Sequence, residues 1–211
     1  MSFPIDKPVI YLITKGEATA PNFGEKSREI LDIIRVAVEE KVSLVQLREK
    51  NLPARLLFEL TNEAAAITRV SSTRLLVNDR ADIAVAAKAD GVHLAANSIP
   101  SSVIRRHFPK NLIIGVSTHT NEEAINASAN RADFVVFGPV FATPDKGEPQ
   151  GTAKLSEVCK ALLPFPVLAL GGIDESNVQS VLEAGASGFA AIRSLNDPDS
   201  LRSICKLAAS S

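Results

Sequence analysis

Short apolar runs recur along the chain, and between them apolar residues return at helical spacing. The runs are largely continuous rather than alternating, which is typical of parallel strands buried on both faces. They predict strands at residues 9–14, 44–49, 74–79, 91–95, 112–117, 134–140, 166–171 and 188–194. Segments 25–40 and 54–69 each carry an apolar stripe, which predicts helices that cover the sheet with one face.

Eight strands that are each followed by a helix can close into a (β/α)8 barrel, whose active site lies where the strands end. The length of 211 residues is near the short end for this fold. We therefore expect an α/β protein with a single TIM-barrel domain over residues 1–211. A doubly wound open sheet is the alternative, but no G-x-G-x-x-G follows the first run.

Helix starts and long connections refine this picture. Thr120 followed by Glu123 is a capping box, and Asp174 can cap a helix that begins near Ser176. The connections at 15–24 and 141–153 are longer than the usual ~2–6 residues between strand and helix. Both should lie on the catalytic face, where long loops tend to act as lids.

Composition narrows the function classes. The net charge is −1 with both signs mixed along the chain, which excludes an electrostatic footprint for nucleic acid or an anionic membrane. No run approaches ~18 apolar residues, and the first residues lack a leader pattern, so we expect a cytoplasmic protein. Cys159 and Cys205 fall in predicted helices without metal-ligand spacing, as expected of packing residues in a reducing compartment.

Two cations close the second predicted strand. Alternation would send Gln46, Arg48 and Lys50 toward the barrel mouth, where an arginine fork and a lysine point charge can hold a diphosphate. The plainer interpretation is a strand end with solvated charges.

Polar and glycine residues follow three further strands. Asn78 can hydrogen-bond a ligand, and Asp79 can hold Mg²⁺ through a carboxylate oxygen or simply cap a helix. Gly171, Gly172 and Ser194 stand where many such barrels bind phosphate through backbone N–H groups, although a double glycine is also a common tight turn.

Six motifs occur in one order and spacing over nearly the whole chain. They are QLREK at 46–50, VNDR at 77–80, GVHL at 91–94, GVSTH at 115–119, FGPVFATP-x-K at 137–146 and GGI at 171–173. This set resembles the thiamine-phosphate synthase and TenI family. The resemblance implies thiamine biosynthesis: with Mg²⁺ as cofactor, hydroxymethylpyrimidine diphosphate loses diphosphate and the nitrogen of a thiazole phosphate captures the pyrimidine. Phosphorylated small molecules would be the only ligands, and members of the family are often homodimers.

The resemblance also implies roles for individual residues. Contacts to the pyrimidine diphosphate would come from Gln46, Arg48, Lys50, Asn78, Ser117 and Lys146. Asp79 would bind Mg²⁺, and the thiazole phosphate would be held by Thr143, Gly171, Gly172 and Ser194.

Two departures from the family pattern bear on the activity. The usual G-Q-x-D after H-L, whose aspartate is a second Mg²⁺ ligand, reads Ala-Ala-Asn-Ser at 95–98, so that Ser98 replaces the carboxylate. The usual T-x-T-K reads Thr-Pro-Asp-Lys at 143–146, which would bring Asp145 close to the substrate phosphate and repel it. Arg193, at a position that is usually apolar, could add a compensating cation.

These departures keep two rivals open. A TenI-type thiazole tautomerase needs no metal–diphosphate site and would use His119 for acid–base catalysis, although this histidine also occurs in the synthases and could be a packing or capping residue. A catalytically silent regulator that binds thiazole phosphate is the third reading. His93, in the fourth strand, is expected to be a satisfied core histidine.

Overall fold

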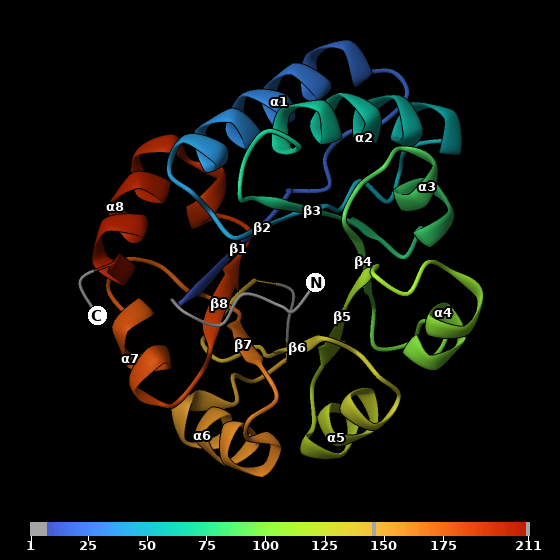
Figure 1. Ribbon diagram of the computed structural model, residues 1–211. Helices are drawn as coiled ribbons and strands as arrows, with labels where there is room; N and C mark the ends of the chain where they lie inside the picture. The colour runs from blue at the N-terminus through green and yellow to red at the C-terminus, as the bar shows by residue number, and fades with distance from the viewer. Residues whose placement is uncertain (1–7, 145–146, 210–211) are drawn as a thin grey trace.

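The computed structural model describes residues 8–144 and 147–209. Eight parallel strands close into a barrel in chain order, and helices surround it (Figure 1). The strands are β1 Val9–Ile13, β2 Leu44–Leu47, β3 Arg74–Asn78, β4 Gly91–Leu94, β5 Ile113–Thr118, β6 Phe134–Phe137, β7 Val167–Leu170 and β8 Gly188–Ala191. The helices are α1 Phe23–Glu39, α2 Ala54–Thr68, α3 Ala81–Ala86, α4 Ser101–His107, α5 Asn121–Ala129, α6 Gly151–Leu162, α7 Val178–Glu183 and α8 Pro198–Ala209, with a short 3₁₀ helix, η1, at Ser194–Asn196. The TIM barrel expected from the sequence is confirmed.

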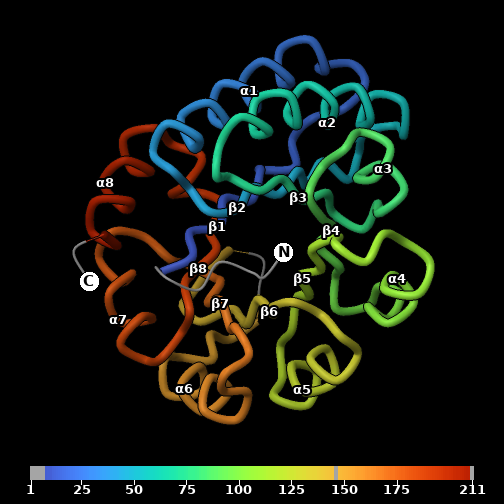
Figure 2. The backbone as a smooth tube through the Cα atoms, viewed as in Figure 1, coloured from blue at the N-terminus to red at the C-terminus, as the bar shows by residue number. Residues whose placement is uncertain are grey.

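The core has an inner layer within the barrel and an outer layer around it. Figure 2 traces the ring of helices around the strands. Inside the barrel, Tyr11 and Phe134 meet edge to face with ring centroids 5.7 Å apart. Gly115 on β5 makes room for them, because a Cβ there would lie 2.3 Å from the Phe134 ring. The outer layer lies between strands and helices, which explains why the strands read as continuous apolar runs.

Several strands end earlier than the apolar pattern predicts. β2 ends at Leu47 rather than residue 49, β6 at Phe137 rather than 140, and β8 at Ala191 rather than 194. Past β6 the apolar pattern runs longer than the strand because Val140 remains buried in the loop. The residues just past these ends form the loops at one end of the barrel.

The helix start signals have different outcomes. Thr120 Oγ1 accepts the Glu123 N–H at 3.1 Å, which confirms the cap, although the Glu123 carboxylate reaches the His119 N–H. The prediction for Asp174 is wrong in its boundary. Its carboxylate binds the N–H and hydroxyl of Ser176 in a tight turn, and α7 begins only at Val178.

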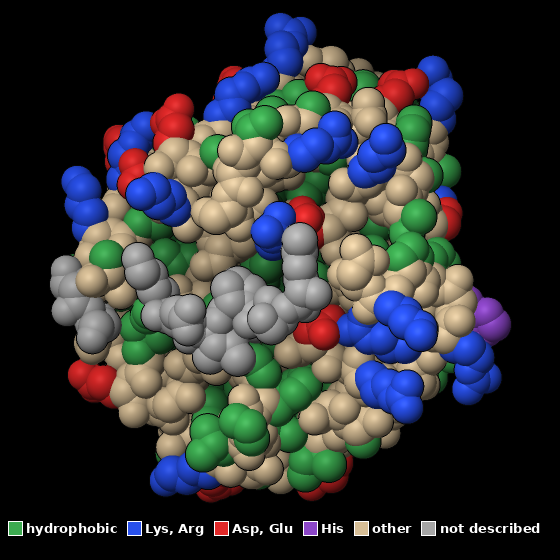
Figure 3. Space-filling model, viewed as in Figure 1, with side chains coloured by type: hydrophobic (Ala, Val, Ile, Leu, Met, Phe, Trp, Pro, Cys, Tyr) green, Lys and Arg blue, Asp and Glu red, His purple; other side chains and the backbone are tan. Residues whose placement is uncertain are grey.

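The remaining sequence expectations concern cysteines, charge and loops. Cys159 and Cys205 are free and buried, and burial raises the pKa of each thiol to about 11, so both serve as packing residues. Lysine, arginine and acidic side chains are interspersed on the face shown in Figure 3. No helix in the described ranges is long and apolar enough to span a bilayer. The two long connections do follow β1 and β6, but their role as lids stays a prediction.

Candidate functional site

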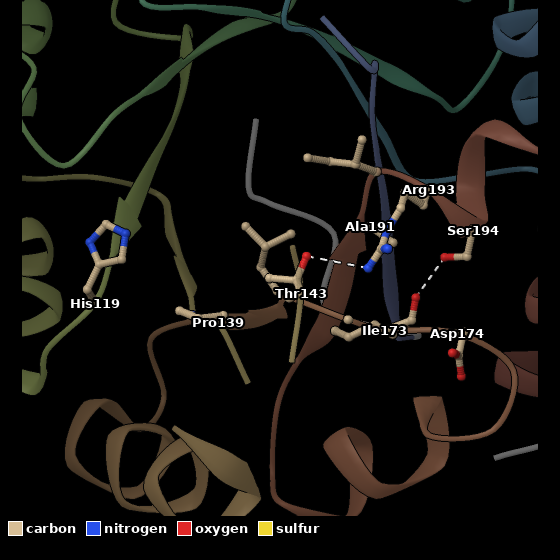
Figure 4. Close-up of a pocket in the computed structure, with 13 residues that line it drawn as sticks. His119, Pro139, Thr143, Ile173, Asp174, Ala191, Arg193 and Ser194 are labelled. Carbon is tan, nitrogen blue, oxygen red and sulfur yellow. Dashed lines mark hydrogen bonds between the residues drawn. The ribbon is translucent and has the colours of Figure 1, made fainter. Parts of the chain in front are cut away.

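A cavity of about 370 Å³ opens at the carboxyl ends of β6, β7 and β8 (Figure 4). Gly171 and Gly172 line it with φ angles of +105° and +63°, a backbone region that favours glycine. A Cβ at Gly172 would lie 2.6 Å from the carbonyl oxygen of Ala142. The double glycine is therefore required by the close approach of the β6 loop, and both glycines line the cavity.

Polar side chains from the β6 loop and the end of β8 also line this cavity. The Ser194 hydroxyl donates to the carbonyl oxygen of Ile173 at 2.7 Å, which ties β8 to the β7 loop. Arg193 is exposed, and its Nη2 lies 3.4 Å from Thr143 Oγ1. Figure 4 shows these two side chains pointing toward each other across the mouth. The Arg193 guanidinium and the Thr143 hydroxyl thus line a space that can hold a phosphate, with Ser194 beside them.

His119 lies at the edge of the same cavity, on the far side of Pro139 in Figure 4. Its side chain is 51% exposed, and its Nδ1 is 3.4 Å from a Glu123 carboxylate oxygen. Gln150 fixes the backbone here, because its Nε2 donates to the His119 carbonyl oxygen at 2.7 Å. His119 is therefore neither a packing residue nor a helix cap, since Thr120 caps α5.

A second polar region lies at the ends of β2 and β3. Arg48 is half-buried, whereas Lys50 is exposed and lines a separate cavity of about 240 Å³ together with Asn78 and Asp79. The expected alternation from Gln46 to Lys50 does not hold that far, because β2 ends at Leu47 and the loop sets the later directions. Arg48 and Lys50 both follow the carboxyl end of β2, and their contact with a diphosphate stays a prediction.

Glu49, between these cations, is buried and was not singled out by the sequence. Its carboxylate accepts hydrogen bonds from Thr14 Oγ1 at 2.6 Å and from the N–H groups of Gly16 at 3.2 Å and Ala18 at 2.8 Å. A buried carboxylate is tolerated when donors surround it in this way. Glu49 holds the β1 loop beside Arg48. Its charged neighbours, Arg48 and Lys50, gave no signal that this residue alone would be buried.

Asp79 has a φ of +54°, an uncommon conformation for a residue other than glycine. Its N–H donates to the His93 carbonyl oxygen at 2.9 Å. The carboxylate accepts from the Ala95 N–H and from Asn78 Nδ2, both at 2.9 Å. The helix-cap reading of Asp79 is therefore wrong, since α3 has no side-chain cap. The carboxylate instead points to the loop after β4.

The side chains near Asp79 that could act as metal ligands limit which metal ion could bind. Within the described ranges, no three histidine, cysteine, aspartate or glutamate side chains cluster as a metal site. Ser98, half-buried in the loop that Asp79 contacts, brings a hydroxyl in place of a carboxylate. One exposed carboxylate fits a Mg²⁺ ion that keeps waters and shares substrate phosphate oxygens, and it does not fit an all-protein cage.

Inside the mouth, a chain of hydrogen bonds links four strands. Gln46 Nε2 donates to Tyr11 Oη at 3.0 Å, Tyr11 Oη lies 3.2 Å from His93 Nδ1, and His93 Nε2 lies 2.8 Å from Ser117 Oγ. Burial lowers the pKa of His93 to about 4; Asp79 raises it and Arg48 lowers it to a smaller extent. His93 is a satisfied core histidine, as expected, but it bonds two residues of interest. Tyr11 was missed, although a lone tyrosine in a buried strand was a usable signal.

Two of the residues expected at the site lie outside the described ranges. They are Asp145 and Lys146, so the effect of Asp145 on a phosphate and the compensating role of Arg193 stay predictions. Arg193 itself does line the phosphate-sized cavity.

Comparisons with known proteins agree with this geometry. A family model described as thiamine monophosphate synthase matches residues 10–195. The thiamine-phosphate synthase of Roseiflexus castenholzii is 38% identical over 214 residues, covering 98% of this chain and 91% of the relative. That of Methanoculleus marisnigri is 40% identical over 170 residues, with 79% and 80% covered. The solved thiamine phosphate pyrophosphorylase from Pyrococcus furiosus superposes with a TM-score of 0.84 at 29% identity and covers 98% of each chain. The chain belongs to the thiamine monophosphate synthase (TenI) family.

Proposed function

We propose that the chain is a thiamine-phosphate synthase, a transferase that joins hydroxymethylpyrimidine diphosphate to thiazole phosphate and releases diphosphate. One observation carries the assignment beyond family membership. Two polar regions, one with Arg48 and Lys50 and one with Arg193, lie at the same end of a single barrel. Two phosphorylated substrates can therefore meet over the mouth.

The region at β2 and β3 suits the diphosphate. Arg48 offers a planar fork of donors and Lys50 a compact charge, and Asn78 adds an amide beside them. On the family resemblance, Lys146 brings a further cation. Gln46 and Ser117, at the ends of the buried hydrogen-bond chain, are assigned to the rest of the pyrimidine substrate.

The cavity at β6 to β8 suits the thiazole phosphate. Backbone N–H groups at Gly171 and Gly172, the Thr143 hydroxyl and the Arg193 guanidinium are the donors that a phosphate monoester prefers. The Ser194 hydroxyl would join them by turning from the Ile173 carbonyl oxygen to the phosphate. The volume of about 370 Å³ is that of a small-molecule site.

The reaction needs no side-chain nucleophile. The bond from the pyrimidine methylene carbon to the diphosphate oxygen breaks, its electron pair leaves with the diphosphate, and a C–N bond forms to the thiazole nitrogen. Negative charge grows on the leaving group, so preorganised cations lower the barrier. Arg48 and Lys50 perform that role here. Mg²⁺ held by Asp79 and the diphosphate would supply additional positive charge to the leaving oxygens.

His119 supports a second candidate, the TenI-type tautomerase. It is exposed on the cavity assigned to the thiazole phosphate, where a histidine could move a proton on the ring. In that case His119→Ala abolishes the activity, whereas Asp79→Ala leaves the rate nearly unchanged. Equal losses in the two variants would argue against the tautomerase.

The deciding experiment uses the purified chain with pyrimidine diphosphate, thiazole phosphate and Mg²⁺. Formation of thiamine phosphate with equimolar diphosphate supports the synthase. Isomerisation of a carboxylated thiazole phosphate without metal supports the tautomerase instead. Thermal stabilisation by thiazole phosphate with neither product supports a silent regulator. The proposal also extends to a cytoplasmic homodimer, which fractionation and sedimentation would test.

A further inference from the structure

The buried chain of hydrogen bonds in the barrel mouth has a direction. Gln46 Nε2 donates to Tyr11 Oη, so the phenol oxygen accepts one proton and keeps its own. Tyr11 is fully buried, and a buried hydroxyl without an acceptor is costly. Among the described residues, the acceptor within reach is His93 Nδ1 at 3.2 Å. The tyrosine proton therefore points at His93.

The same donor-to-acceptor order continues through the imidazole ring of His93. His93 is 3% exposed and has no carboxylate hydrogen-bonded to either ring nitrogen in the described structure, so the ring carries one proton. Because Nδ1 accepts from Tyr11, that proton sits on Nε2. Nε2–H then donates to Ser117 Oγ, 2.8 Å away.

The last link leaves the Ser117 proton pointing away from His93. Within the part of the chain that the structure describes, no acceptor takes this hydroxyl proton. Ser117 is only partly buried and lies next to the end of β5, at the mouth. It is therefore available to an acceptor that arrives from outside the protein.

We propose that Tyr11 and His93 are positioning residues that preset the Ser117 hydroxyl as a hydrogen-bond donor to an acceptor atom of the pyrimidine diphosphate. This inference rests on the proposed synthase function and deepens it. A serine hydroxyl can otherwise donate or accept in several orientations. The chain removes this freedom before the substrate arrives, and a preorganised donor costs no reorientation at the moment of reaction.

Phe134 packs against both the imidazole of His93 and the phenol of Tyr11. Its ring lies 5.7 Å from that of Tyr11 and 6.1 Å from that of His93, centroid to centroid. Tyr11→Phe preserves this aromatic packing and removes only the hydroxyl. That substitution is therefore the cleanest break in the chain.

The first test reads the ring directly and needs no activity. In a protein carrying His107→Gln and His119→Gln, His93 is the remaining histidine, and a two-bond ¹H–¹⁵N correlation spectrum reports its tautomer. We expect a neutral ring protonated at Nε2 at pH 7. A proton on Nδ1, or on both nitrogens, would reverse or break the chain and overturn the proposal. Tyr11→Phe should abolish the tautomer preference.

The second test is a double-mutant cycle in otherwise wild-type protein. Tyr11→Phe should lower kcat/KM for the pyrimidine diphosphate about five- to tenfold, the worth of one hydrogen bond, with no change in KM for thiazole phosphate. Added to Ser117→Ala, it should cause no further loss, because it acts through Ser117. Thr118→Val is the matched control, since the Thr118 hydroxyl donates to the Val136 carbonyl oxygen instead. Its effect should add to that of Tyr11→Phe.

The two tests separate failure of this proposal from failure of the proposed function. If the wild-type protein makes no thiamine phosphate, the synthase assignment fails while the tautomer result still stands. If it is active and the effects of Tyr11→Phe and Ser117→Ala are additive, the positioning role is wrong and the synthase assignment survives.

Discussion

The carboxylate of Asp79 accepts a hydrogen bond from the backbone N–H of Ala95 at 2.9 Å, which ties the end of β3 to the first residue of the loop after β4. Ser98 lies in that same loop, three residues further on. The loop that carries the family's usual second carboxylate is thus tied to the first carboxylate by a direct contact at Ala95. This relationship makes the missing carboxylate testable.

Ser98→Asp should lower the Mg²⁺ concentration for half-maximal synthase rate about tenfold, because a second carboxylate adds a ligand of the kind Mg²⁺ prefers. Mg²⁺ titrations of thiamine phosphate formation measure the shift. Asn97→Asp is the matched control, since it adds the same charge one residue away at an exposed position. An equal shift in both variants would point to general electrostatic attraction rather than a ligand.

Arg48→Ala should lower the synthase rate by about 10²-fold, as does loss of one preorganised donor to a developing charge. Lys146→Ala is expected to match it on the family resemblance. Steady-state kinetics with saturating thiazole phosphate measure both. Arg35→Ala removes an exposed arginine on α1, paired with Asp32, and serves as the control. If Arg48→Ala and Lys146→Ala both had wild-type kinetics, the synthase assignment would lose its basis.

Gly172→Ala should weaken thiazole phosphate binding and destabilise the fold, because its φ is +63° and a Cβ would press on the Ala142 carbonyl. We expect a loss of about 1–3 kcal/mol in the free energy of unfolding. Calorimetric binding and thermal unfolding measure the two effects. Gly24→Ala is the control, since Gly24 lies in α1 with open space around it, and it should be neutral or slightly stabilising.

The free energy of unfolding should fall as the pH drops from 6.5 toward 4. Burial lowers the pKa of His93 from 6.5 to about 4, so the folded state favours the neutral ring. The stabilisation is fully present above the unfolded pKa and is lost as the unfolded chain takes up a proton, by up to about 3 kcal/mol. Urea unfolding across this range should show a shallower slope for His93→Asn, whereas exposed His107→Gln should follow the wild type. Parallel curves for wild type and His93→Asn would contradict the assignment.

Glu49→Gln should lower the free energy of unfolding by about 1–3 kcal/mol. The carboxylate accepts hydrogen bonds from Thr14 and Ala18, and the NH₂ group of an amide would face one of these donors without accepting its proton. Urea unfolding measures the loss, and limited proteolysis should show faster cleavage in the β1 loop. Glu25→Gln, at an exposed position in the first turn of α1, should have little effect on either measurement. Unchanged loop cleavage in Glu49→Gln would mean that Glu49 does not hold the loop.

The sequence by itself determined the barrel and the places at which its chemistry gathers. Continuous apolar runs at regular intervals specify strands buried on both faces, and polar or glycine residues such as Asn78 and Gly172 mark where those strands stop. Local sequence patterns also predicted the helix cap at Thr120 and the packing role of the two cysteines. These features follow from residues near one another along the chain.

Only the tertiary structure decided what the polar residues do. The sequence left Asp79 as either a metal ligand or a helix cap. In the fold its carboxylate accepts a hydrogen bond from Ala95, in the loop after β4. Glu49 looked like part of a solvated charge run, yet it is buried beneath the β1 loop. Tyr11 and His93 are 82 positions apart and form one hydrogen-bond chain. Closing the barrel sets these long-range partners, and spacing along the chain cannot reveal a partner that only closure brings within 3 Å or so.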